Sequence, residues 1–459
     1  MRRLLIALAT LFSVALSLFP TAAAAAYAPG TYTGTLADGA IYKIEVPIGW
    51  NGTLVLYSHG YSTSPTGATD IGDAATGAWL LSHGYALAGS SYATTGWALQ
   101  QAFPDQMAVL DVFQPTVGEA PTRTIAWGPS LGGMITAGLV QLHPDRFDGA
   151  IPMCGVVAGG VGAWNQGLDA AFAFKTLLGV APTALNTSPL QLVHITSPFG
   201  NLGASLNVLN QAQATPQGRA RIALAAAFGD VPGWFSFSSA EPDPTDYAAR
   251  EQNQYLWDAN VDFFFLFAAR AELEARAGGN VSWNTSVNYK VQLAHSINQD
   301  EVVALYAAAG LDLDQDLQTL QNATRIAADA GAVAYLESNI VYNGALGLPV
   351  LTMHTTGDGL VTPNNEQAYA SAVRSAGDNS LLREVFVHRA GHCTFTPAET
   401  IAAFQTLVHR LDTGHWRDST DPELMNAAAT ALGALNYAPP SFIEYQPPRF
   451  LRPFDAGDI

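Results

Sequence analysis

The chain has 459 residues and carries 38 acidic against 20 basic side chains, which gives a formal net charge of −18 at pH 7. A strongly acidic surface disfavours nucleic acids and anionic membranes as partners, because both repel it. Only 13% of the residues are charged and 49% are hydrophobic, so the composition is that of a folded globular chain and not of a disordered one.

The N-terminus has the pattern of a secretory signal peptide. Residues 1–3 supply two arginines, residues 4–19 are apolar, and the alanines at 22–26 form a small-residue cleavage site. The apolar stretch is short for a membrane span, and no second apolar run of about 20 residues follows it. We therefore expect a secreted protein without a stable membrane anchor, cleaved near Ala26, whose mature chain begins around Tyr27.

The following part of the chain alternates strands with helices. Between turn signals such as Asp38-Gly39, we expect strands over residues 31–36, 41–46, 53–58, 86–91, 124–127 and 148–153. Helical patterns cover residues 73–83, 98–113 and 131–142. Strands that are apolar along their whole length and separated by helices indicate an α/β fold with a mostly parallel sheet, covered by helices on both faces.

This alternation then stops and later resumes. From residue 155 to residue 346 the pattern is mainly helical, with stretches at 168–178, 219–228, 259–277 and 314–330. Strands return at 348–354 and 383–388, and a helix is expected over 397–411. Roughly 190 residues between two strands of one sheet are too many for a loop, so they indicate an inserted cap.

The resulting domain organisation has four parts. We expect a signal peptide over residues 1–26, an α/β core formed by 27–154 and 347–435, a helical cap over 155–346, and a Pro-rich C-terminal strap over 436–459.

Ser130 lies in the most informative motif of the chain. It is the serine of Gly128-Pro129-Ser130-Leu131-Gly132, which directly follows a predicted apolar strand and directly precedes a predicted helix. That context is typical of a nucleophile elbow, in which the flanking glycines allow a tight turn and the serine hydroxyl projects above the sheet. A nucleophilic serine needs a base to take its proton and an acid to orient that base.

Candidates for the acid and the base follow in chain order. Asp358 lies in a Gly-flanked turn after the strand at 348–354, and His392 follows Gly391 on the loop after the strand at 383–388. Both positions are at the carboxyl end of a strand, where side chains reach the active edge of the sheet. The other histidines and aspartates considered for these roles are His59, His354, His388, Asp148 and Asp378. We expect His354 and His388 in the core, and the two aspartates at the surface.

These motifs together resemble the α/β-hydrolase superfamily. The resemblance covers residues 31–155 and 347–414, somewhat under half of the chain, and includes a further motif, Ser58-His59-Gly60-Tyr61. It implies that Ser130 is the nucleophile, His392 the general base and acid, and Asp358 the orienting carboxylate. It also implies an oxyanion hole built from the backbone amides of Leu131 and Tyr61. The acid turn departs from the commonest spacing by one additional residue, Thr362.

Cys154 and Cys393 are the only cysteines. In an exported protein such a pair favours a disulfide, with two buried free thiols as the alternative. Cys393 directly follows His392, so a bond to Cys154 would tether the histidine loop to the sheet. We expect no metal site, because the His and Cys residues lack ligand spacing, and no organic cofactor, because the reaction of a Ser-His-Asp triad needs none.

The sequence predicts a secreted serine hydrolase that cleaves carboxylic esters. Its substrate would be a small or polymeric ester with a hydrophobic acyl or bulky group under the cap. The cap is rich in aromatic residues: Trp164, Phe172, Phe174, Phe199, Trp234, Phe235, Phe237, Tyr255, Trp257, Phe263, Phe264, Phe265 and Phe267.

Two alternatives to an esterase stay open. An exported aminopeptidase on the same scaffold would bind a free substrate amine through cap carboxylates, for which Glu241, Asp243, Asp246, Glu272 and Glu274 are available. A binding protein that kept the fold without catalysis is expected to lack a triad residue, whereas all three are present in this chain.

Overall fold

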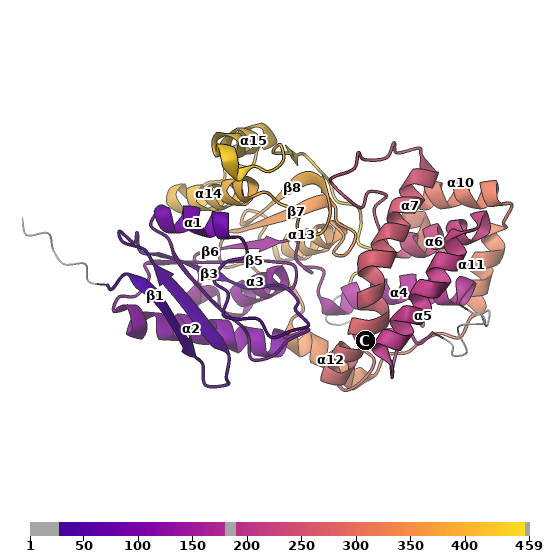
Figure 1. Ribbon diagram of the computed structural model, residues 1–459, viewed down its shortest axis with the longest axis horizontal. Helices are drawn as coiled ribbons and strands as arrows, with labels where there is room; N and C mark the ends of the chain where they lie inside the picture. The colour runs from indigo at the N-terminus through magenta and orange to yellow at the C-terminus, as the bar shows by residue number, and fades with distance from the viewer. Residues whose placement is uncertain (1–26, 180–189, 455–459) are drawn as a thin grey trace, which may run out of the picture.

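A computed structural model describes residues 27–179 and 190–454, and the segment expected to be a signal peptide lies outside the described residues. The chain forms a sheet lobe and a helical lobe that lie side by side (Figure 1). The two segments of the sheet lobe are separated in sequence by the helical lobe, as expected for an inserted cap. Among the described helices, none has both the length and the apolar character that crossing a membrane requires.

The sheet lobe contains nine described strands in the order β1-β2-β4-β3-β5-β6-β7-β8-β9. From β4 to β8 all neighbouring strands are parallel, while β1, β2 and β9 pair antiparallel at the two sides. This topology confirms the expected α/β-hydrolase fold class. The strands are β1 (Gly30–Thr35), β2 (Ile41–Val46), β3 (Thr53–Tyr57), β4 (Ala86–Ser90), β5 (Arg123–Pro129), β6 (Gly149–Met153), β7 (Val350–Gly357), β8 (Leu382–Ala390) and β9 (Phe442–Ile443).

Helices cover both faces of the sheet because its central strands are apolar on both sides. In β3, Leu54 and Leu56 belong to one hydrophobic cluster and Val55 and Tyr57 to another, as the alternation of side chains along a strand requires. The first cluster includes α2 (Leu99–Val117), α3 (Leu131–Leu142) and α13 (Asn364–Ala376). The second includes α1 (Ala74–Ser82), α14 (Pro397–Thr413) and α15 (Pro422–Ala431).

The cap has a hydrophobic cluster of its own, formed by helices between β6 and β7. One long helix runs from Tyr247 to Ala277 and contains two π-helical segments, η2 (Asp258–Asp262) and η3 (Phe265–Ala269), between α7 (Tyr247–Trp257) and α8 (Arg270–Ala277). The other cap helices are α4 (Gly160–Leu178), α5 (Pro198–Gln213), α6 (Pro216–Gly229), α9 (Tyr289–His295), α10 (Gln299–Ala309), α11 (Leu313–Asn322) and α12 (Ala330–Asn339).

The single helix expected over residues 314–330 was wrong. Helix α11 ends at Asn322, and α12 begins only at Ala330. The residues between them pair with a neighbouring loop instead of continuing the helix. The Asn284 N–H donates to the Ile326 carbonyl at 3.0 Å, and the Ile326 N–H donates to the Asn284 side chain at 2.8 Å. Helical periodicity alone does not reveal that such an external partner is present.

The described part of the C-terminal segment runs from the sheet lobe to the cap. It first adds β9 to the sheet, beside β8. The Phe450 N–H then donates to Gln367 on α13, and the Arg452 guanidinium pairs with Asp169 on α4 at 2.5 Å. The described residues of this segment therefore contact both lobes.

Candidate active site

Ser130 lies at the sharp turn between β5 and α3. Its backbone has φ 59° and ψ −126°, a strained conformation for a residue with a side chain. Gly128 and Gly132 permit this turn, because a Cβ at either position would clash with the Ser58 carbonyl oxygen. The Ser130 N–H donates to the Met153 carbonyl at 2.9 Å, which ties the elbow to the end of β6.

His392 reaches Ser130 from the loop that follows β8. The Ser130 hydroxyl donates to His392 Nε2 at 2.8 Å, and His392 Nδ1–H donates to Asp358 Oδ2 at 2.7 Å. Gly391 has φ 102°, a conformation that favours glycine, and this turn brings the imidazole over the elbow. The three residues predicted as a triad are thus brought together in the order of a nucleophile, a base and an orienting acid.

Asp358 lies in the turn after β7 and is fully buried. Its Oδ1 accepts the N–H groups of Leu360 and Val361 at 3.1 and 3.0 Å. Burial opposes ionisation of Asp358, but the electrostatic attraction and the hydrogen bonds of His392 and His354 outweigh it, so its pKa is lowered below the ordinary value. The additional residue Thr362 does not prevent this geometry.

His354 was expected to be an ordinary core histidine, and the structure gives it a more specific position. It is fully buried, with Nδ1 2.8 Å from Glu366 Oε1 and Nε2 2.7 Å from the Val361 carbonyl oxygen. Its Nε2 also lies 3.6 Å from Asp358 Oδ2, the oxygen that accepts from His392. Both ring nitrogens face acceptors, so the doubly protonated imidazolium fits this site.

The ionisation of His354 agrees with that geometry. Burial opposes its charge, but the hydrogen bonds and negative charges of Asp358 and Glu366 raise its pKa to about 10. The triad is therefore extended to a chain of five residues, in which the fully buried His354 and Glu366 follow Ser130, His392 and Asp358. A histidine inside a predicted buried strand, with a glutamate in the first turn of the next helix, was the signal available in the sequence.

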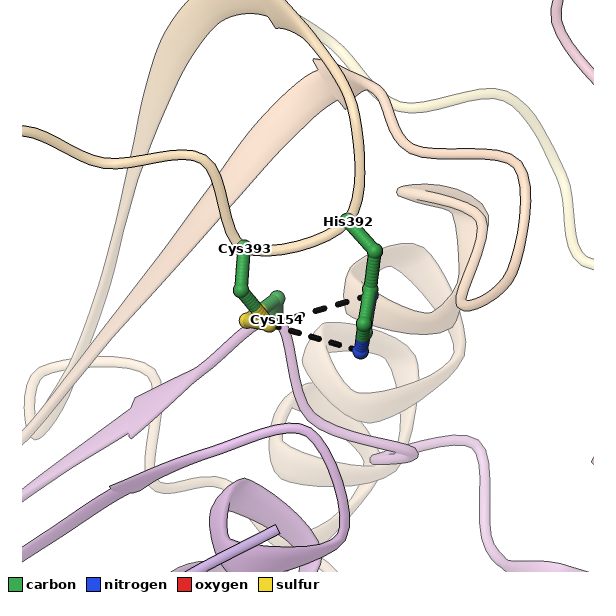
Figure 2. A group of neighbouring side chains, drawn as sticks. All are labelled: Cys154, His392 and Cys393. Carbon is green, nitrogen blue, oxygen red and sulfur yellow. Dashed lines mark hydrogen bonds between the residues drawn. A yellow bond between two sulfur atoms is a disulfide. The ribbon is translucent and has the colours of Figure 1, made fainter. Parts of the chain in front are cut away.

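Cys154 and Cys393 form a disulfide, as the first of the two sequence interpretations expected. Figure 2 shows the bond directly beside the His392 ring, with Cys393 Sγ at 3.4 Å from Nε2 and 3.7 Å from Nδ1. The bond joins the end of β6 to the histidine loop across 239 residues of sequence. The two cysteines and His392 lie within 4.8 Å of one another, but sulfurs joined in a disulfide are not the thiolate ligands of a metal site.

The two residues expected to supply the oxyanion hole lie at the same pocket as Ser130. Leu131 is the first residue of α3. Tyr61 follows Gly60, which lies so close to the elbow that a Cβ at Gly60 would be 3.5 Å from the Ser130 Cβ. N–H groups in the first turn of a helix have no partner within the helix, and the helix dipole favours negative charge there. His59 orders this loop, because its Nδ1–H donates to the Gly60 carbonyl at 2.7 Å and its ring stacks on Tyr92.

The rival acids and base have other partners. Asp148 accepts the Thr124 N–H, and Asp378 accepts the Leu346 N–H. The expectation that His388 lies in the core was wrong, because its side chain is 43% exposed and pairs with Glu241 at 3.0 Å, away from the elbow.

A largely apolar pocket opens over Ser130 between the sheet lobe and the cap. It contains about 1100 Å³ of space, part of it open to solvent. Residues of α4, α6, η2 and η3 line it, together with the acid turn and the C-terminal segment. Its aromatic lining residues are Tyr61, Trp97, Trp164, Phe174, Phe263, Phe265 and Phe450. The sequence predicted such a pocket but not which cap aromatics form it.

The cap carboxylates considered for binding a substrate amine lie elsewhere. Glu272 accepts the Trp97 N–H and pairs with Arg276, while Glu274 pairs with Arg270. Asp246 caps α7, and Asp243 accepts bonds from Thr245 in an exposed turn. None of these groups, nor Glu241, is among the described residues that line the pocket.

Comparisons with known proteins agree with a hydrolase. Residues 82–159 match the model of the prolyl oligopeptidase family. The chain is 31% identical over 421 residues to an o-phthalyl amidase from Xanthobacter agilis, and the match covers 87% of this chain and 90% of that protein.

Two solved structures have lower similarity. Feruloyl esterase B from Aspergillus oryzae is 12% identical with a TM-score of 0.38, over 84% of this chain and 86% of that one. An acylaminoacyl peptidase from Pyrococcus horikoshii is 10% identical with a TM-score of 0.37, over 84% of this chain but only 42% of the peptidase. Likenesses of this size carry no information about activity.

Proposed function

We propose that this chain, which belongs to the same protein family as the o-phthalyl amidase of Xanthobacter agilis, hydrolyses amides of aromatic carboxylic acids through Ser130. The observation that carries the proposal is the hydrogen-bonded chain from Ser130 through His392 to Asp358 at an apolar pocket. An aromatic acyl group matches a pocket with this many aromatic walls.

The reaction follows from the positions of these groups. His392 Nε2 takes the Ser130 proton as the serine oxygen attacks the carbonyl carbon, and Asp358 stabilises the imidazolium that forms. The backbone amides of Leu131 and Tyr61 stabilise the negative oxygen of the tetrahedral intermediate. His392 then gives its proton to the leaving amine, which departs from an acyl-enzyme. Water, deprotonated by His392, attacks the acyl-enzyme and releases the carboxylic acid and the free serine.

Carboxylic esters, which the sequence predicted as the principal substrates, are the second substrate class. An ester passes through the same acyl-enzyme, and an alcohol is the easier leaving group because it needs less help from His392. We therefore expect activated aryl esters to be cleaved as well as amides. The family relationship to an amidase favours the amide as the principal substrate.

A labelling experiment and a substrate panel test this proposal. A fluorophosphonate probe should label the wild-type protein, and the label should disappear in Ser130→Ala. Aroyl p-nitroanilides should then be cleaved faster than aminoacyl p-nitroanilides, with p-nitrophenyl benzoate as a positive control for acyl transfer. Absence of labelling in folded protein would support a binding protein, while a preference for aminoacyl anilides would support the aminopeptidase.

We also propose that the protein is exported and cleaved near Ala26. The Cys154–Cys393 disulfide supports this, because such bonds persist in oxidising compartments. N-terminal sequencing of protein recovered from culture medium tests it. A protein that stays inside the cell with residues 1–26 attached would contradict it.

A further inference from the structure

The pocket contains two carboxyl groups that the proposed reaction does not use. Asp258 and Asp262 lie one turn apart on η2, and both line the pocket although only 5% and 7% of their surfaces are exposed. Neighbouring lining residues such as Phe263 and Leu266 are apolar. Polar groups buried among apolar ones cost free energy unless they find hydrogen-bond partners.

Asp262 has no such partner in the part of the chain that the structure describes. Both of its carboxyl oxygens are almost fully covered, so a ligand in the pocket reaches them only after the side chain turns toward it, and neither makes a hydrogen bond to a described residue. Glu272 and Glu274, on the same long helix, show the usual alternative, because each is held by an arginine and by a backbone N–H. A buried group left unpaired at a pocket wall is a candidate to bind a ligand.

The backbone holds this pair beside the acid turn. Trp257 immediately precedes η2 and packs on Gly359 so closely that a Cβ at that position would clash with the indole ring. Gly359 follows Asp358, and the next residues of the turn, Leu360 and Val361, line the same pocket. The π-helical geometry of η2 is itself a feature that occurs frequently at functional sites.

The surroundings favour the uncharged form of both carboxyl groups. Burial raises the pKa of Asp258 and of Asp262 well above the ordinary value, and nearby carboxylates raise them further: Glu251 for Asp258, and Asp258 and Asp358 for Asp262. The described lining residues include no lysine, arginine or histidine. A protonated carboxyl group is a hydrogen-bond donor, which an ionised one is not.

We propose that Asp258 and Asp262 form a subsite that donates hydrogen bonds to an acceptor oxygen on the acyl group, such as a second carboxyl or carbonyl group of the aromatic acid. This subsite rests on the proposed function, because it assigns the acyl group to the pocket beside Ser130. It adds polar specificity to a largely apolar pocket, since an acyl group without that oxygen leaves both donors unpaired. A substrate ammonium group is the opposing case, because it requires at least one ionised aspartate.

Two kinds of substitution separate these cases. Asp258→Asn and Asp262→Asn keep an uncharged donor of the same shape, whereas Asp258→Leu and Asp262→Leu remove it. The measured quantity is kcat/KM for p-nitroanilides of the three carboxybenzoic acids and of a carbamoylbenzoic acid, each divided by that for the benzoyl anilide. We expect the leucine variants to lower this ratio about 10- to 100-fold and the asparagine variants to change it less than about fivefold.

The substrate arms identify the acceptor. If the leucine variants lower the ratio for the carboxybenzoyl anilides alone, the subsite binds a carboxylate. If they lower it for the carbamoylbenzoyl anilide as well, the subsite binds any acceptor oxygen. Leu266→Ala enlarges the same wall without removing a donor, and should leave the ratio unchanged. Equal losses on the substituted and the benzoyl anilides in the leucine variants, or a selective loss of aminoacyl anilide cleavage in the asparagine variants, would overturn the proposal.

A binding measurement keeps this test separate from the proposed function. In the Ser130→Ala background, phthalate and its two isomers should raise the melting temperature more than benzoate does, and Asp262→Leu should remove the difference. This outcome supports the subsite even if no anilide is cleaved. Active wild-type enzyme with no difference between these ligands and benzoate would overturn the subsite while leaving the hydrolase intact.

Discussion

The sheet core and the cap wall both bury carboxyl groups, and the two sets differ in what surrounds them. In the core, Asp358 and Glu366 meet the imidazole rings of His392 and His354. On the cap wall, Asp262 meets no partner among the described residues. Accordingly the pKa of Asp358 is lowered, whereas burial raises that of Asp262 well above the ordinary value. The ion pairs of the core hold the catalytic side chains in one arrangement. The unpaired carboxyl group of Asp262 on the cap wall keeps its hydrogen-bonding capacity for a substrate.

The same pairing continues behind the histidine loop. Arg389 at the end of β8 makes a bidentate contact with Glu399, at 2.5 and 3.0 Å, and both side chains are buried. Glu399 also closes the capping box of α14 by accepting the Thr396 N–H. The loop that carries His392 is therefore flanked by the buried ion pairs Arg389–Glu399 and His354–Glu366 and is held by the disulfide of Cys393.

Breaking the core pairing at His354 should have the largest effect. We expect His354→Leu to lower kcat about 100-fold, because a shift of the acid turn misplaces His392. We also expect about 3–5 kcal/mol less stability, because Glu366 is left as a buried charge without a partner. The acid limb of the kcat/KM–pH profile should move to higher pH, since loss of the imidazolium raises the pKa of Asp358. Steady-state kinetics and urea unfolding measure these effects.

The pH dependence of stability should report the charge on His354. The pKa of His354 is raised from 6.5 to about 10, so its contribution to stability is complete below about pH 6.5 and is lost as the pH rises towards 10. The stability difference between wild type and His354→Leu should shrink over that range. His388→Gln, at a half-exposed histidine of β8, is the matched control. Equal effects of the two substitutions would show that the buried chain has no special role.

Removing the disulfide should have the next largest effect. The double variant Cys154→Ala/Cys393→Ala should lose about 2–5 kcal/mol of stability, because the bond closes a long loop. We expect kcat to fall by about tenfold or less, since His392 keeps its hydrogen bond to Asp358. Treatment of the wild type with dithiothreitol should reproduce both changes. Unchanged melting temperature and kcat after complete reduction, verified by thiol titration, would contradict this role.

At the cap wall, substitution should act in the opposite direction. Asp262→Asn should raise stability by about 1 kcal/mol at pH 7, because it removes a carboxyl group whose ionisation is opposed by burial. A folded-state pKa raised above 3.8 destabilises the protein as the pH increases from about 4, so the gain should grow with pH. Asp246→Ala, which removes the N-cap of α7 on the same helix, should instead cost about 1 kcal/mol. A loss of stability in Asp262→Asn would show that Asp262 is paired.

The core was largely predictable because its motifs consist of residues that a particular local backbone conformation requires. Gly128 and Gly132 are needed where the elbow passes the Ser58 carbonyl, so the pattern around Ser130 predicts its own geometry. Asp358 and His392 were predicted to lie close to Ser130 because each follows the carboxyl end of a predicted strand. His354 was missed, because its role depends on Glu366 from the next helix, and a histidine inside an apolar strand has the same local pattern whether or not it carries charge.

The cap was predictable only as a set of helices. Its pocket wall is created by packing between helices that are distant in sequence, and hydrophobic periodicity does not say which residues of a helix meet a cavity. Asp258 and Asp262 have the spacing of an ordinary solvent-exposed pair, and the five cap carboxylates named from the sequence are on other surfaces. The π-helical turn that holds this pair could also not be predicted from its amino-acid composition.

The smallest effect is expected for a charge pair at the surface of the cap. Lys290 Nζ lies 2.8 Å from Asp314 Oδ1, but both side chains are about three-quarters exposed, with 73% and 77% of their surfaces accessible. Water already solvates both ions and salt screens them, so Asp314→Asn should leave the melting temperature and kcat/KM unchanged within error. Differential scanning calorimetry at low and high salt checks this. A shift comparable to that of His354→Leu would show that the difference between core and cap lies in overall charge and not in the burial of individual pairs.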